Sequence, residues 1–118
     1  MKYTVDIPMK LPSANDYILA CRTNKFKAAK MKSDVEQHLL YYLREMPRFD
    51  NPVKIKFTWV EGNKRRDLDN VAFAKKFVLD AMVKGKNLKD DNRKNVTSFT
   101  DDFQYGKDFK VILEVSDE

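Results

Sequence analysis

Residues 53–70, VKIKFTWVEGNKRRDLDN, decide the fold because they contain a strand, a turn and the start of a helix. Apolar and polar side chains alternate from Val53 to Trp59, which predicts a strand with one buried face. Glu61-Gly62-Asn63 then breaks the strand. Asp69 or Asn70 suits the N-cap of the following helix, since a short side-chain oxygen can accept a hydrogen bond from a free backbone N–H.

Three cations, Lys64, Arg65 and Arg66, directly precede two aspartates one residue apart, Asp67 and Asp69. A surface that only needs to be soluble does not require this arrangement. Mg²⁺ prefers hard oxygen ligands and shares its coordination shell with substrate oxygens, while cations beside the carboxylates attract a polyanion. The stretch therefore indicates a metal-dependent nuclease centre, in which the three cations hold the phosphates that flank the cut.

The helix expected over residues 70–83 has one apolar arc, formed by Val71, Ala74, Val78, Ala81 and Met82. At about 100° per residue, Asp69 and Lys76 lie only about 20° apart on the opposite side. Lys75 points towards the apolar arc. Lys76 is therefore predicted to face the same site as Asp69. Asp80 either extends this site or pairs with Lys76 or Lys84 at i,i+4 spacing.

The remaining elements are predicted from the spacing of apolar residues, which is two in a half-buried strand and three or four in a helix. Residues 2–7, 96–99 and 109–115 are predicted strands, residues 24–46 a long helix, and residues 101–108 a hairpin-like loop. Residues 15–22 form either a short helix or an ordered loop. The order β-α-β-α-β-β, with about four strands and two main helices, predicts an α/β fold of the α+β type with a mixed sheet, in one domain over residues 1–118.

The composition favours an acidic partner. The net charge is +5 and the pI about 9.3, which suggests nucleic acid first and an anionic membrane surface second. No apolar run approaches the ~20 residues that span a bilayer, so no membrane association is expected. The single cysteine excludes an intrachain disulfide. These features suit a cytoplasmic protein.

The predicted long helix carries a run of lysines outside its apolar stripe: Lys25, Lys27, Lys30 and Lys32. Such a run is typical of a solvated helix face. A nuclease centre in the same chain makes a role on the DNA backbone an equal alternative, and Lys27 and Lys30 are the candidates for it.

A second acidic pair, Asp90-Asp91, completes a pattern that resembles a known family. Residues 65–70 (RRDLDN), residues 79–82 (LDAM) and this pair resemble the RusA family, as does the early segment Pro12-Ser13-Ala14-Asn15. RusA proteins are small homodimeric, Mg²⁺-dependent Holliday junction resolvases common in phages and prophages. The resemblance implies a crossover junction endodeoxyribonuclease acting in DNA recombination and repair, with paired nicks in a four-way junction.

Carried over residue by residue, the resemblance makes Asp67, Asp69 and Asp91 the metal-binding catalytic carboxylates, with Mg²⁺ as cofactor and Mn²⁺ able to substitute. It adds Asn15 to the DNA-binding residues. The essential lysine of the family falls on Phe73 when counted from Asp69, and on Lys76 when counted back from residues 80–82. Two alternatives stay open: a nuclease for other branched or replication-fork DNA, and a non-catalytic basic DNA-binding module.

Overall fold

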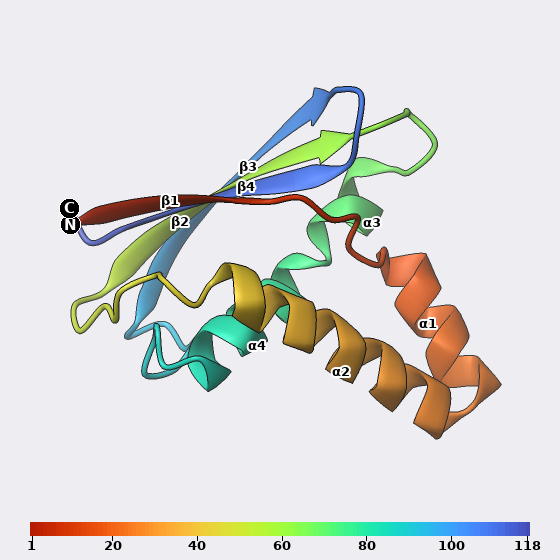
Figure 1. Cartoon of the computed structure of the whole chain (residues 1–118), viewed down its shortest axis with the longest axis horizontal. Helices are drawn as coiled ribbons and strands as arrows, with labels where there is room; N and C mark the ends of the chain where they lie inside the picture. The colour runs from red at the N-terminus through yellow and green to blue at the C-terminus, as the bar shows by residue number, and fades with distance from the viewer.

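The computed structural model describes residues 1–118 and shows a four-stranded mixed sheet with helices on one of its faces (Figure 1). The elements are β1 (Lys2–Ile7), α1 (Ala14–Thr23), α2 (Lys25–Tyr42), β2 (Val53–Glu61), α3 (Leu68–Ala72), α4 (Lys75–Lys84), β3 (Val96–Tyr105) and β4 (Lys110–Ser116). The predicted α+β class with a mixed sheet is confirmed, and the undecided segment 15–22 is helical.

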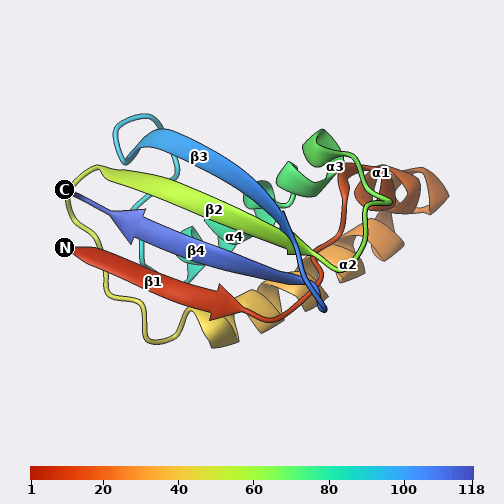
Figure 2. The same cartoon turned by 90° about the horizontal axis from the view of Figure 1, so that it is seen from above.

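The strand with the clearest alternation, β2, lies inside the sheet. The strand order is β1-β4-β2-β3, with β2 and β3 parallel and β4 antiparallel to both β1 and β2 (Figure 2). Parallel neighbours need a long crossover, and here α3 and α4 provide it. The side chains of β2 that face the helices, from Val53 to Trp59, are buried.

The hairpin predicted after residue 99 is wrong. The third strand continues to Tyr105, and β4 pairs with β1 and β2 while β3 lies on the other side of β2. The prediction failed because β3 is an edge strand that is mostly exposed, so its sequence lacks the alternation that marks a half-buried strand. The segment between Tyr105 and Lys110 therefore crosses one end of β2.

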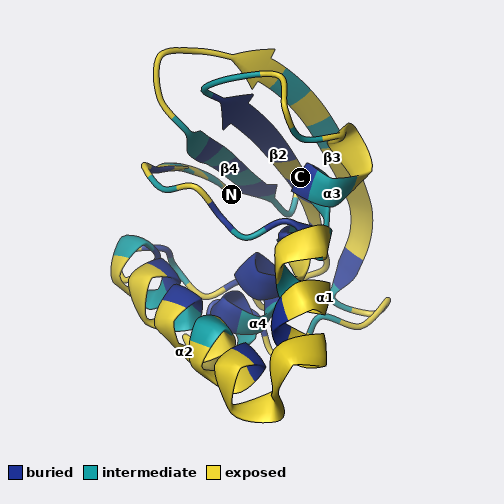
Figure 3. Cartoon of the chain, turned by 90° about the vertical axis from the view of Figure 1, so that its right-hand side faces the viewer, coloured by how far each residue is buried: buried dark blue, intermediate teal, exposed yellow.

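The core lies between the sheet and helices α2 and α4. The apolar arc predicted for residues 71–82 is buried in full. From the other side, Val35 and Leu39 of α2 are buried in the same cluster. Figure 3 shows that the buried residues gather on β2 and on the inner sides of α2 and α4. None of the helices is both long and apolar enough to cross a bilayer.

The two long helical predictions need corrections at their ends. Helix α2 ends at Tyr42 instead of near Met46, because Leu43 leaves helical geometry. Met46 is nevertheless buried, and its carbonyl accepts a hydrogen bond from the side chain of Asn87 at 2.8 Å. The helix predicted over residues 70–83 is two helices, α3 and α4, which are separated by Phe73 and Ala74.

Candidate active site

Asp67 and Asp69 lie at the start of α3, which follows β2 in the chain. Asp67 is the N-cap residue of α3, instead of the predicted Asp69 or Asn70, and its side chain makes no capping hydrogen bond. Asp69 lies in the first turn, and both aspartates are exposed. Neither carboxylate forms an ion pair or a side-chain hydrogen bond, whereas most other acidic side chains of the chain do. Two neighbouring carboxylates are therefore free to accept a cation or a donor.

Two of the three cations before these aspartates are also free. Lys64 and Arg65 are exposed and have no acidic partner within ion-pair distance. The ammonium of Lys64 lies 4.9 Å from the centre of the ring of Tyr105, the last residue of β3. An aromatic face and two guanidinium or ammonium groups beside free carboxylates are suited to a nucleic acid backbone with exposed bases.

Arg66 has a different environment from the one the sequence predicts. Its guanidinium donates to both carboxylate oxygens of Glu61, at 2.7 and 2.8 Å, and to the carbonyl of Leu11 at 2.8 Å. The side chains of Arg66 and Glu61 are only 14% and 10% exposed. Each of its three nitrogens therefore already donates to a partner inside the fold, which gives Arg66 a structural role. Its role as a phosphate ligand stays a prediction.

Lys76 lies between the carboxylates of Asp80, on the same helix, and Asp91. Its ammonium is 3.1 Å from Asp80 Oδ1 and 3.6 Å from Asp91 Oδ2. Asp80 also lies 3.4 Å from the ammonium of Lys32 on α2. The hydrogen bond to Asp80 raises the pKa of Lys76, and Asp91 adds to this effect. Of the interpretations offered for Asp80, the pairing with Lys76 is the one that the structure contains; Lys84 pairs with Glu36 instead.

Lys75 points into the protein, as the helical wheel predicted. Its ammonium donates to Asp101 Oδ2 at 2.6 Å and lies 4.8 Å from the centre of the Phe99 ring. The other oxygen of Asp101 accepts a hydrogen bond from the indole N–H of Trp59 at 2.9 Å. Lys75 therefore joins α4 to β3 and β2, while its neighbour Lys76 remains 60% exposed.

The predicted carboxylates divide into two groups. Asp67 and Asp69 begin α3, whereas Asp91 contacts Lys76 of α4. No three Asp, Glu, His or Cys side chains of residues 1–118 come together as a metal-binding group. The oxygen donors have the right chemistry for Mg²⁺, but the single chain does not gather all three around one point. Magnesium binding by the three carboxylates stays a prediction.

The remaining predicted DNA contacts lie on α1 and α2. Lys27 and Asn15 are exposed, and neither side chain has a partner within the protein. Lys30 forms an exposed ion pair with Asp34 at 2.8 Å, which would compete with a phosphate. Of the two helix lysines, Lys27 is therefore the better placed to bind an anion.

Sequence reasoning missed Glu61 and Asp101, whose carboxylates bind Arg66 and Lys75. A signal for each was present. A buried Trp needs an acceptor for its indole N–H, and Asp101 is an acid in the next strand. Glu61 has the same parity as the buried residues of β2, so an acid there requires a buried cation.

Comparisons with known proteins leave the family open. No protein-family model matches the chain, and no curated protein is significantly similar to it.

Proposed function

We propose that this chain is a RusA-like, Mg²⁺-dependent endonuclease that resolves four-way DNA junctions by paired nicks in the cytoplasm. The observation that carries the proposal is the free pair Asp67 and Asp69. Neither carboxylate makes a capping hydrogen bond or an ion pair within the protein. Exposed acids beside the cations Lys64 and Arg65 would repel DNA unless a metal ion intervened.

Each free group has a definite task in this proposal. Lys64 and Arg65 bind the phosphates on either side of the cut, and Arg's planar fork suits two phosphate oxygens. Asp67 and Asp69 offer hard oxygens to Mg²⁺, which in nucleases activates water and stabilises the leaving oxygen. Paired nicks require two such sites on one junction, so the active species is a homodimer.

Lys76 supplies a fixed positive charge for the phosphate in this proposal. Asp80 positions its ammonium through the 3.1 Å contact and favours its protonated form. Asp91 is the second neighbour of this ammonium. To bind Mg²⁺, Asp91 would have to give up its ion pair with Lys76, because that ammonium already balances the charge of the carboxylate.

The function is tested on labelled four-way junction, replication fork, linear duplex and single-stranded DNA, each with Mg²⁺, Mn²⁺ or EDTA. We expect symmetric nicks in two strands of the junction with either metal, none with EDTA, and little cutting of linear duplex. Equal cutting of all four substrates would reject junction selectivity. DNA binding with no cutting under any condition would leave only a non-catalytic DNA-binding module.

The two neighbouring lysines of α4 should respond in opposite ways to alanine. Lys76→Ala should reduce cleavage about a hundredfold. It should change the free energy of unfolding by less than about 1 kcal/mol, because the Lys76 side chain is 60% exposed and Asp80 keeps Lys32 as a second cation. Lys75→Ala should lower the free energy of unfolding by about 1–3 kcal/mol, because it leaves Asp101 without its charged donor. Urea denaturation and junction cleavage measure the two effects. A cleavage defect confined to Lys75→Ala would remove Lys76 from the proposed site.

A further inference from the structure

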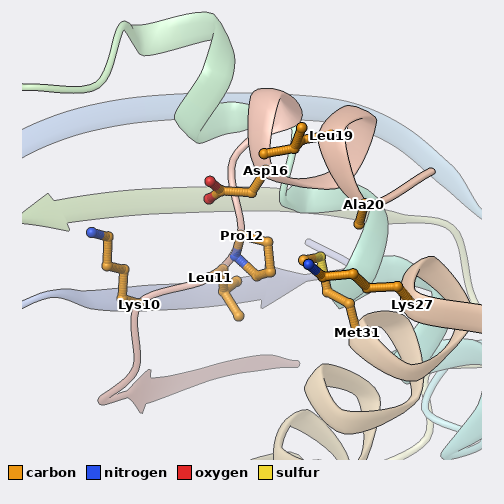
Figure 4. A pocket seen from close by; sticks show the side chains of 8 residues that line it. All are labelled: Lys10, Leu11, Pro12, Asp16, Leu19, Ala20, Lys27 and Met31. Atoms are coloured by element: carbon orange, nitrogen blue, oxygen red, sulfur yellow. The ribbon is translucent and has the colours of Figure 1, made fainter. Parts of the chain in front are cut away.

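One cavity is large enough for a small organic group and shares only Lys27 with the candidate site described above. It has a volume of about 420 Å³ and lies between α1, α2 and the segment that connects β1 to α1. Figure 4 shows its lining side chains at close range. Its walls are largely apolar and come from Leu11, Leu19, Ala20 and Met31. Pockets of this size with apolar walls and a few polar groups are typical of ligand sites.

The polar groups of the cavity are two ammonium groups and one carboxylate. Lys10 comes from the segment before α1, and Lys27 from α2. Neither ammonium lies within ion-pair distance of an acid, although other lysines of the chain do. One oxygen of Asp16 accepts a hydrogen bond from the backbone N–H of Ser13 at 2.9 Å, which leaves its other oxygen as a free acceptor.

We propose that this cavity receives an unpaired nucleobase of the DNA substrate, while Lys10 and Lys27 bind the phosphates of the same nucleotide segment. The proposal rests on the proposed function. The apolar walls suit the flat face of a base. The free oxygen of Asp16 can accept from an N–H group on the base edge. An anionic group placed at Asp16 would be repelled, so the phosphates belong at the two ammonium groups.

The cavity is joined to the candidate active site by one hydrogen bond. The carbonyl of Leu11, whose side chain lines the cavity, accepts from the guanidinium of Arg66 at 2.8 Å. Arg66 directly precedes Asp67 in the chain. The segments that carry the cavity and Asp67 are therefore neighbours, and the proposal places a base and a phosphate of one DNA molecule on them. Branched DNA offers unpaired or easily unpaired bases at its branch point, whereas a linear duplex must first unstack a base.

The proposal is tested by binding in EDTA, which separates it from cleavage. The probes are a fluorescent oligo(dT) of about ten nucleotides, which is within the usual single-strand site size, and a longer linear duplex that is stable at the assay temperature. Leu19→Ala removes part of an apolar wall, and Leu19 is 66% exposed, so the fold is not at risk. We expect this change to weaken oligo(dT) binding about fivefold and leave duplex binding unchanged.

Two matched variants serve as controls. Ile18 precedes Leu19 on α1, is also exposed, and does not line the cavity; Ile18→Ala should leave both affinities unchanged. Lys27→Ala should weaken oligo(dT) binding more than Lys25→Ala does, since only Lys27 lines the cavity. Equal effects of Leu19→Ala and Ile18→Ala, or equal losses on oligo(dT) and duplex, would overturn the base-binding role.

The outcome is independent of the nuclease chemistry. If the cavity proposal alone is wrong, the Leu19→Ala protein binds oligo(dT) normally and the unchanged protein still cuts junctions with Mg²⁺. If the proposed function is wrong, no metal supports cleavage, although the Leu19-dependent preference for oligo(dT) remains. If the cavity binds an acidic apolar peptide instead of a base, oligo(dT) binding is insensitive to both Leu19→Ala and Lys27→Ala, which also overturns the proposal.

Discussion

Replacing Asp69 with asparagine should abolish junction cleavage while junction binding is retained. Asparagine keeps the shape of the side chain but removes the charge that a divalent cation requires. Asp69 makes no ion pair and no side-chain hydrogen bond, so the change leaves no buried group without a partner. We expect cleavage with Mg²⁺ to fall at least about a hundredfold, measured under single-turnover conditions. Asp67→Asn should behave in the same way.

The matched control for these variants is Asp108→Asn. Asp108 is likewise exposed and makes no ion pair, but it lies between β3 and β4 instead of at the start of α3. Asp108→Asn should retain full activity. Because all three changes remove one exposed negative charge, a general electrostatic effect on DNA binding would appear in each of them. Full activity of Asp69→Asn would remove this residue from the site.

The parts of the fold that could be predicted are those whose signal is local. Strand β2 and the buried arc of α3 and α4 have strict periodicities of two and 3.6, because one face of each packs against the core. These periodicities gave the correct class and the correct buried residues. They also placed Lys75 towards the interior, although the helix is interrupted at Phe73 and Ala74. That Lys76 faces the same site as Asp69 stays a prediction.

The sheet order could not be predicted in this way, because it depends on pairing between distant residues. Strand β4 pairs with β1 at the far end of the chain, for example Leu113 with Val5. No local pattern distinguishes this arrangement from a hairpin of β3 and β4. The mixed polarity of β3, with Asp101 and Asp102 in its middle, hid the second half of that strand as well.

The candidate site was predicted in part for the same reason. The free carboxylates Asp67 and Asp69 and the neighbouring cations are adjacent in sequence, so the motif alone identified them. Asp101, the partner of Lys75, comes close only through the folded sheet, because it lies on β3. Glu61, the partner of Arg66, is nearby in the sequence, at the end of β2. Its burial, which makes it a partner for Arg66, follows from the strand periodicity and not from the cationic motif.

Arg66→Ala should destabilise the protein far more than Arg65→Ala. Removing Arg66 leaves the carboxylate of Glu61 buried without a cation, and such a loss typically costs about 3–5 kcal/mol. It also removes the donor to the Leu11 carbonyl. Arg65 is exposed, so its replacement should change the free energy of unfolding by no more than about 0.5 kcal/mol. Urea denaturation of both variants measures the difference.

A second substitution separates the ion pair from the rest of the effect. Glu61→Gln in the Arg66→Ala background removes the unpaired buried charge, so the double variant should be more stable than Arg66→Ala alone. A double variant that is less stable would show that Glu61 has another partner once Arg66 is gone. If Arg66→Ala and Arg65→Ala both change the free energy of unfolding by the same small amount, Arg66 is not structural and its assignment as a phosphate-binding residue is favoured. Arg66 connects Glu61, at the end of β2, to Leu11, which lines the cavity. Its loss should therefore also weaken oligo(dT) binding.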